Sequence, residues 1–109
     1  MIKKITEIAS VIRSKNAGPY ELTLDIIFKS PAIFQQVKES KVITKELIAS
    51  LYHIPVKQVI SVVEFEPAYA VKATIVRPRV AGSLGESDVY GAQQHGPLLT
   101  LEFEIDESK

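Results

Sequence analysis

The strongest structural signal in this sequence is the run Tyr20-Glu21-Leu22-Thr23-Leu24-Asp25-Ile26-Ile27-Phe28-Lys29. Apolar side chains occupy every second position from Tyr20 to Phe28, and polar residues fill most of the positions between them. A period of two is typical of a β-strand with one face on a hydrophobic core and one polar face. We therefore expect a half-buried strand over Tyr20–Lys29, in a sheet that has one solvated face.

Two helices are expected after this strand. Ser30 fits an N-cap and Pro31 fits the first helical position. Thr44 begins a second helix, and Glu46 suits the positive end of that helix. The expected buried positions are Ile33, Phe34 and Val37 in the first helix, and Leu47, Ile48, Leu51 and Tyr52 in the second.

The second half of the chain predicts more strands. Val59–Glu66 and Ala68–Arg77 are rich in valine and isoleucine, and only a tight turn at Pro67 separates them. Residues 79–97 follow without convincing periodicity and are expected to form a long loop. Leu99–Ile105 alternates again and predicts a last half-buried strand.

Toward the N-terminus the pattern is open to two interpretations. Apolar residues at helical spacing predict a short amphipathic helix over residues 3–12. Alternatively, Val11 and Ile12 begin a strand that runs into Arg13. The following run, Ser14–Pro19, is expected to be a turn or loop.

These elements predict one α+β domain over residues 1–109. A chain of 109 residues fits a single domain with a real core. Packing the helices on one face of a mainly antiparallel sheet buries the apolar side chains economically. We expect a ferredoxin-like arrangement of this kind.

Composition excludes several classes of function. Thirteen basic and thirteen acidic residues balance, so no overall field attracts nucleic acid, and a near-zero net charge suits a domain with a protein partner. Cysteine is absent, which excludes disulfides and thiolate metal sites. No apolar run is long enough for a signal peptide or a membrane span, so we expect a cytoplasmic protein without a membrane partner.

The first candidate binding segment lies in the long loop. Its polar residues can recognise a carbonyl, a carboxylate or a backbone, because two amides and an imidazole supply several donors and acceptors. Long structureless loops in compact domains tend to be functional or disordered. In the alternative interpretation the tyrosine packs on the core and the amides hold the loop. The candidates are Asp88, Tyr90, Gln93, Gln94 and His95.

The second candidate is the basic turn before the Tyr20 strand. Arg13, Ser14, Lys15 and Asn16 gather two cations, a hydroxyl and an amide, which suits an anion. The spacing matches neither a P-loop nor a dinucleotide fingerprint. The alternative interpretation is a solvated turn.

A self-sufficient catalytic set is missing from the sequence, and we expect no cofactor and no metal centre. His53 is expected to be structural, at the negative end of a helix. Glu21 and Asp25 would lie about 13 Å apart on one strand face, which is too far to share a proton. With Glu102 and Glu104 they are expected to form a solvated or partner-facing sheet surface.

Three segments resemble a bacterial family of small proteins of unknown function. Ile12–Ile26 resembles the opening signature of that family, Pro67–Lys72 its hairpin, and Asp88–Leu99 its closing signature. Members of the family are similar in gene context to partners of the acyclic terpene utilisation (AtuA-like) proteins. Some AtuA-like proteins carry a ferredoxin-fold extension with an Arg-Ser-Gly-Asp-Lys-Gly loop where Arg13–Gly18 stands here, although the present loop lacks the aspartate.

The resemblance implies work with a larger AtuA-like protein in the catabolism of carboxylic acids and their thioesters. One hypothesis is a non-catalytic accessory subunit that docks on this protein through Arg13, Lys15, Gln93, Gln94 and His95. A second is a composite lyase or isomerase site, in which the two cations hold a carboxylate and His95 moves a proton. A third is a free-standing binder of an organic acid or acyl thioester, or a homo-oligomer. All three predict that the two polar segments converge.

Overall fold

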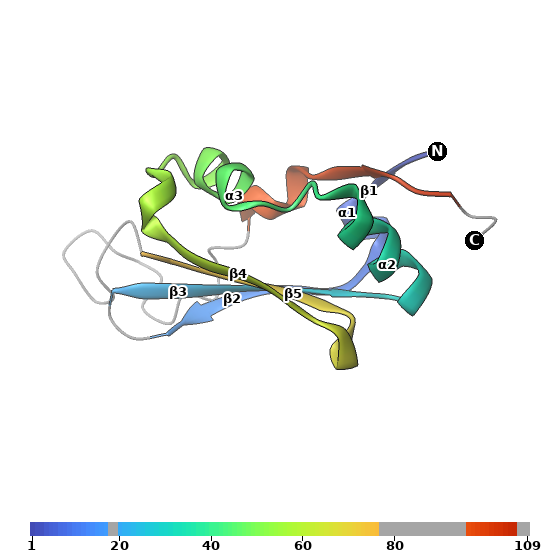
Figure 1. Ribbon diagram of the computed structural model, residues 1–109, viewed down its shortest axis with the longest axis horizontal. Coiled ribbons are helices and arrows are strands. Elements are labelled where there is room, and N and C mark those ends of the chain that lie inside the picture. Colours follow the sequence, from blue (N-terminus) through green and yellow to red (C-terminus); the bar gives the residue numbers. More distant parts are fainter. Residues whose placement is uncertain (18–19, 77–95, 107–109) are drawn as a thin grey trace.

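Two antiparallel sheets and three α-helices make up an α+β fold in the computed structural model, which describes residues 1–17, 20–76 and 96–106 (Figure 1). The α+β class and the antiparallel pairing confirm the prediction from sequence. The elements are β1 Ile2–Lys4, α1 Ile5–Ile8, β2 Ala9–Asn16, β3 Glu21–Phe28, α2 Pro31–Ser40, α3 Lys45–Tyr52, η1 Val56–Gln58, β4 Val59–Phe65, η2 Glu66–Ala68, β5 Ala70–Val76, η3 Gly96–Thr100 and β6 Glu102–Glu104.

The larger sheet has the strand order β2-β3-β5-β4, and every neighbouring pair is antiparallel. One of its two central strands is β3, the strand with the clearest alternation, which pairs with β2 on one side and β5 on the other. The ferredoxin-like arrangement is not confirmed. That arrangement follows the order β-α-β-β-α-β, whereas here two hairpins flank two consecutive helices.

The hydrophobic core lies on one side of this sheet. Figure 1 shows α1, α2, α3 and the β1–β6 pair all above the sheet. The alternate residues of β3 that face them are almost fully buried, as the alternation predicts. The core residues on β3 and β5 are Leu22, Leu24, Ile26, Phe28, Val71, Ala73 and Ile75, and those on the two longer helices include Phe34, Val37, Ile48 and Ala49.

Both predicted helix caps are confirmed. The Oγ atom of Ser30 accepts a hydrogen bond from the backbone N–H of Ile33 at 3.2 Å. The Oγ1 atom of Thr44 accepts one from the backbone N–H of Leu47 at 3.1 Å. These bonds satisfy helical N–H groups that have no partner within the helix.

The prediction of a helix over residues 3–12 was wrong beyond one turn. The helix spans only Ile5–Ile8, and β2 begins at Ala9. The alternative, in which Val11 and Ile12 begin a strand, is the one that the structure has. The strand forms because each residue from Val11 onward finds a partner on β3, and the ladder outweighs a weak local helical pattern.

The predicted turn is likewise shorter than expected, since Ser14, Lys15 and Asn16 belong to β2. They pair with Leu24, Thr23 and Leu22 of β3, so their backbone groups enter a sheet rather than a loop.

The C-terminal strand also differs from the expectation. Residues Gly96–Thr100 form the 3-10 helix η3, and only Glu102–Glu104 are in a strand. This strand, β6, pairs with β1 in a separate two-stranded sheet. The predicted alternation still holds, because Leu101, Phe103 and Ile105 are buried and Glu102 and Glu104 are exposed.

Within the described ranges, the helices are all too short or too polar to cross a membrane.

Candidate functional site

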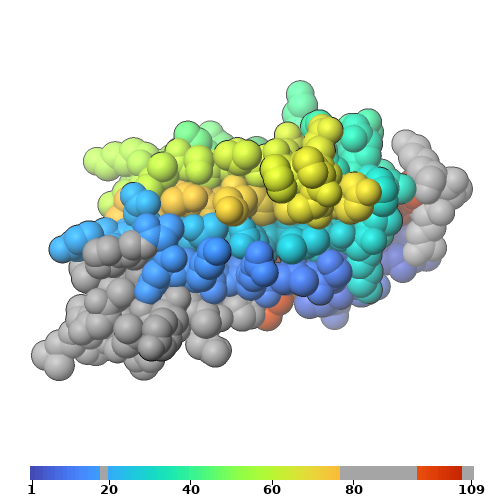
Figure 2. All heavy atoms as spheres, turned by 90° about the horizontal axis from the view of Figure 1, so that it is seen from below, coloured from blue at the N-terminus to red at the C-terminus, as the bar shows by residue number. Residues whose placement is uncertain are grey.

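The second face of the large sheet is not covered by any described helix or strand, and Figure 2 looks onto it. Residues that pair directly across an antiparallel sheet point to the same face. The register aligns Arg13 of β2 with Asp25 of β3, Asp25 with Lys72 of β5, and Lys72 with Val63 of β4. One row of side chains therefore crosses all four strands on the uncovered face.

An ion pair lies at the centre of this row. The Nε atom of Arg13 donates a hydrogen bond to Oδ2 of Asp25 at 3.0 Å. Asp25 is 5% exposed, although it belongs to the uncovered face, whereas the Arg13 side chain is 57% exposed. A buried carboxylate needs such a partner, because its desolvation is costly. The guanidinium is thereby anchored at one end and open to solvent at the other.

Two further cations lie beside this pair. Lys15 is two residues beyond Arg13 and so shares its face, opposite Thr23. Lys72 stands on the far side of Asp25. Within the described residues, no ion pair or side-chain hydrogen bond engages Lys15 or Lys72. Three cations surround the single carboxylate of Asp25, so this part of the uncovered face has an excess of positive charge, with Glu21 further along β3 on the same face.

The charged row ends at the apolar residue Val63, and further apolar residues border it. Phe65 is 56% exposed and Val63 is 51% exposed, which is high for side chains of this size on a sheet. In the register, Phe65 pairs with Ala70 and Ala70 pairs with Ile27. A second row, apolar throughout, thus lies next to the charged one.

Together the two rows form a hollow of about 440 Å³, here called the sheet-face groove. A volume of roughly 300–1,000 Å³ is typical of sites for small molecules. One side of the groove is cationic and the other is apolar, so it suits an anionic group attached to an apolar body. The residues that line it are Arg13, Lys15, Asp25, Ile27, Val63, Phe65, Ala68, Ala70 and Lys72.

The structure separates the residues of the predicted basic turn. Because strand side chains alternate, Arg13 and Lys15 face the groove, whereas Ser14 pairs with Leu24, a core residue, and is 5% exposed. Asn16 follows the same alternation as Ser14, opposite Leu22. The four candidates therefore do not form a single cluster.

The second predicted segment lies outside the described residues. It comprises Asp88, Tyr90, Gln93, Gln94 and His95. Its convergence with Arg13 and Lys15 therefore stays a prediction.

Sequence reasoning missed part of the groove. It assigned Asp25 to a solvated or partner-facing surface, but Asp25 and Thr23 are both nearly buried. Neither Lys72 nor Phe65 was a candidate, because the alternation within one strand does not say which strand lies beside it. The one available signal was the opposite charge of Arg13 and Asp25 on strands joined by a short connection.

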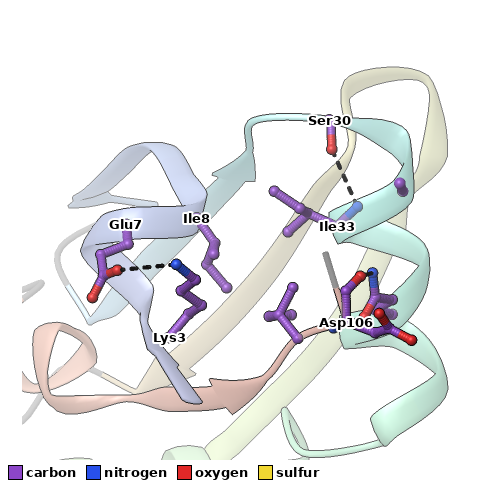
Figure 3. Close-up of a pocket in the computed structure, with 9 residues that line it drawn as sticks. Lys3, Glu7, Ile8, Ser30, Ile33 and Asp106 are labelled. Carbon is purple, nitrogen blue, oxygen red and sulfur yellow. Dashed lines mark hydrogen bonds and ion pairs between the residues drawn. The ribbon is translucent and has the colours of Figure 1, made fainter. Parts of the chain in front are cut away.

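A second hollow in the described part of the chain is lined by residues with structural roles. The hollow in Figure 3, about 320 Å³ in volume, lies between α1, α2 and the segment that follows β6. Gln36 clamps this segment: its Nε2 donates to the backbone oxygen of Asp106 at 3.0 Å, and its Oε1 accepts from the backbone N–H of Asp106 at 2.7 Å. The hydroxyl of Ser30 accepts the N-cap hydrogen bond of α2. The Nζ atom of Lys3 lies 3.8 Å from Oε2 of Glu7.

A further hollow of about 480 Å³ lies between α2, α3 and the edge of the sheet. Lys38, Lys41 and Lys45 border it, but Glu64 lies among them and Lys38 is bound to Glu66 on η2. The hydrogen bond and the charge of Lys38 lower the pKa of Glu66, and the same contact raises the pKa of Lys38. The acidic residues offset the cations here, so this hollow is a weaker anion site than the groove.

His53 lies at the C-terminal end of α3, the position that the sequence predicted for it. It ends α3 in the left-handed conformation, with φ 55°, and its N–H bonds the carbonyl oxygens of Ala49 and Ser50. Among the described residues, no three histidine or acidic side chains are grouped closely enough to hold a metal ion.

Comparison with known proteins gives a family without a function. No curated protein and no solved structure gives a significant match to this chain. The model of a family described as a domain of unknown function, DUF4387, matches residues 5–102, which include every described element from α1 to β5. Since this match spans most of the 109 residues, the chain belongs to the DUF4387 family.

Proposed function

We propose that this chain is a non-catalytic accessory subunit or domain that binds a larger AtuA-like protein through the uncovered face of its four-stranded sheet. The carrying observation is the exposure of Phe65 and Val63 on that face, next to Arg13, Lys15 and Lys72. The choice of an AtuA-like partner, and of a role in carboxylic-acid or acyl-thioester catabolism, rests on the sequence resemblance.

The composition of this face supports a protein contact. Contiguous exposed apolar side chains on a soluble domain mark interaction surfaces. Aromatic residues and arginine are enriched in protein interfaces, and hot spots cluster where such residues become fully desolvated. Phe65 and Arg13 supply both types.

The charge of the face specifies the partner surface. Three cations surround one buried carboxylate, so the complementary surface carries acidic side chains opposite Arg13, Lys15 and Lys72 and apolar ones opposite Phe65. Complementary charge speeds association and makes it sensitive to salt. Complex formation is therefore expected to weaken as the salt concentration rises.

Co-expression with an AtuA-like protein followed by size-exclusion chromatography tests this proposal. The two chains are expected to co-elute at micromolar concentration. Val63→Glu should raise the dissociation constant at least tenfold, since it buries a charge in an apolar contact.

Val56→Glu is the matched control. Val56 is 43% exposed, lies in η1 and does not line the groove, so this variant should bind like the wild type. Separate elution of the wild-type chains, or equal binding by Val63→Glu and Val56→Glu, would contradict the proposal.

A further inference from the structure

The geometry points to a binding site for a small organic carboxylate with an apolar chain in the sheet-face groove, present in the isolated chain. This inference goes beyond the proposed partner and does not depend on it. It is carried by the side-by-side rows of cationic and apolar residues on one sheet face.

Arg13 is prepared to receive a carboxylate. Its bond to Asp25 uses Nε, which fixes the plane of the guanidinium and leaves the Nη1 and Nη2 groups to point elsewhere. A guanidinium has five N–H donors in a rigid fork, and a carboxylate accepts two of them in parallel. Asp25 is therefore a positioning residue: it holds Arg13 but, as an anion, does not itself bind the ligand.

Lys72 and Lys15 complete the cationic side. Side chains directly opposite on neighbouring strands are about 5 Å apart at Cβ, so Arg13 and Lys72, one strand removed from each other, are roughly 10 Å apart. Both side chains are long enough to reach an oxygen between them. Lys15 lies two residues from Arg13 along β2, on the side of the charged row that is away from the apolar row. The positive charge exceeds what Asp25 neutralises, and one added carboxylate would reduce that excess.

The apolar row gives the ligand its direction. Going from the charged row to the next, Asp25 is followed by Ile27, Lys72 by Ala70, and Val63 by Phe65. A ligand with its carboxylate at Arg13 therefore extends its chain across Ile27 and Ala70 toward Phe65. Each CH₂ group that leaves water stabilises the bound ligand, so the chain and the charge both add to affinity.

The shape and charge together disfavour other ligands. Inorganic phosphate would satisfy the cations but leave the apolar row exposed. An alcohol or amide of the same chain would cover the apolar row but leave the cations without an anion. The groove is thus expected to bind a carboxylate with an apolar chain more tightly than an anion without a chain or a chain without a charge.

The inference is tested by titrating each ligand into the isolated 109-residue chain and monitoring the NMR chemical shifts of the backbone. The probes are hexanoate, hexanamide, acetate and inorganic phosphate. Hexanoate is expected to bind at least tenfold more tightly than each of the others and to shift the backbone signals of Asp25, Ile27 and Lys72. Equal affinity for hexanoate and hexanamide, or for hexanoate and phosphate, would overturn the assignment.

Substitutions locate the site. Lys72→Met keeps most of the side-chain length and removes the charge, so it should weaken hexanoate binding about tenfold. Phe65→Ala should weaken hexanoate binding and leave the weak binding of acetate as it is. Lys57→Met, on an exposed lysine of η1 outside the groove, is the control and should bind like the wild type. Unaltered hexanoate binding by a folded Lys72→Met variant would rule out this site. The co-elution test uses no ligand, so the two proposals can fail independently of each other.

Discussion

Arg13 and Asp25 pair across the β2–β3 ladder, with Nε and Oδ2 3.0 Å apart, on a sheet face that no described element covers. The pair is asymmetric, since Asp25 is 5% exposed and the Arg13 side chain is 57% exposed. The buried carboxylate of Asp25 therefore needs the arginine as a hydrogen-bond donor, whereas the exposed guanidinium of Arg13 can also bond water. Because of this asymmetry, we expect the two residues to be coupled in their effect on the free energy of unfolding.

Arg13→Ala is expected to lower the free energy of unfolding by about 1–3 kcal/mol, because it leaves the buried carboxylate of Asp25 without its hydrogen-bond donor. Adding Asp25→Asn removes the buried charge and should restore part of the loss. Urea unfolding of the two single variants and the double variant measures this coupling. Losses that simply add in the double variant would show that the pair contributes no interaction energy.

His53 is expected to act through its backbone conformation rather than through its ring. With φ 55°, it occupies the left-handed region that glycine adopts without steric cost. His53→Gly should therefore leave the free energy of unfolding unchanged or raise it by up to about 1 kcal/mol. His53→Val should lower it by more than about 1 kcal/mol, since a β-branched residue fits this region poorly.

Thermal and urea unfolding distinguish these outcomes. A loss of more than about 1 kcal/mol in His53→Gly would mean that the imidazole makes a contribution of its own.

Tyr52 is expected to make the protein sensitive to alkali. Burial raises the pKa of its hydroxyl above the usual value near 10. Above pH 10 the unfolded chain loses this proton while the folded chain keeps it, so the unfolded state binds fewer protons and stability falls as pH rises. The stability that the buried, protonated Tyr52 hydroxyl allows is fully present below pH 10 and is lost progressively above it.

Urea unfolding between pH 8 and pH 11 compares Tyr52→Phe with the wild type. Relative to its value at pH 8, the difference should shift by about 1 kcal/mol in favour of the phenylalanine variant at pH 11. Tyr20 is 63% exposed, and Tyr20→Phe is the control, whose curve should stay parallel to that of the wild type. Parallel curves for Tyr52→Phe as well would contradict the expected effect of burial.

Local features of the fold were predictable because neighbouring residues decide them. The side-chain hydroxyls of Ser30 and Thr44 bond N–H groups three residues further on, so each helix start is written into a few consecutive positions. The alternation over Glu21–Phe28 identified the core face of β3 in the same way. Where a local signal was weak, as before Ala9, pairing with a distant strand decided the conformation instead.

The candidate site was predictable only in part. Arg13 and Lys15 were recognised as cations in one short segment, yet Ser14 and Asn16 between and beside them belong to the opposite face of β2. A turn would have gathered all four, whereas a strand separates odd from even positions.

The sequence by itself determined the α+β class, the two helix caps, the β4–β5 hairpin and which residues of β3 face the core. Tertiary structure alone decided that Arg13, Asp25, Lys72 and Val63 form one row on the sheet face that no described element covers. The physical reason is that alternation fixes the side of a strand on which a residue lies, but the strand order and register choose its neighbours. Those depend on how whole strands pack against the core, and segments far apart in the sequence settle them together.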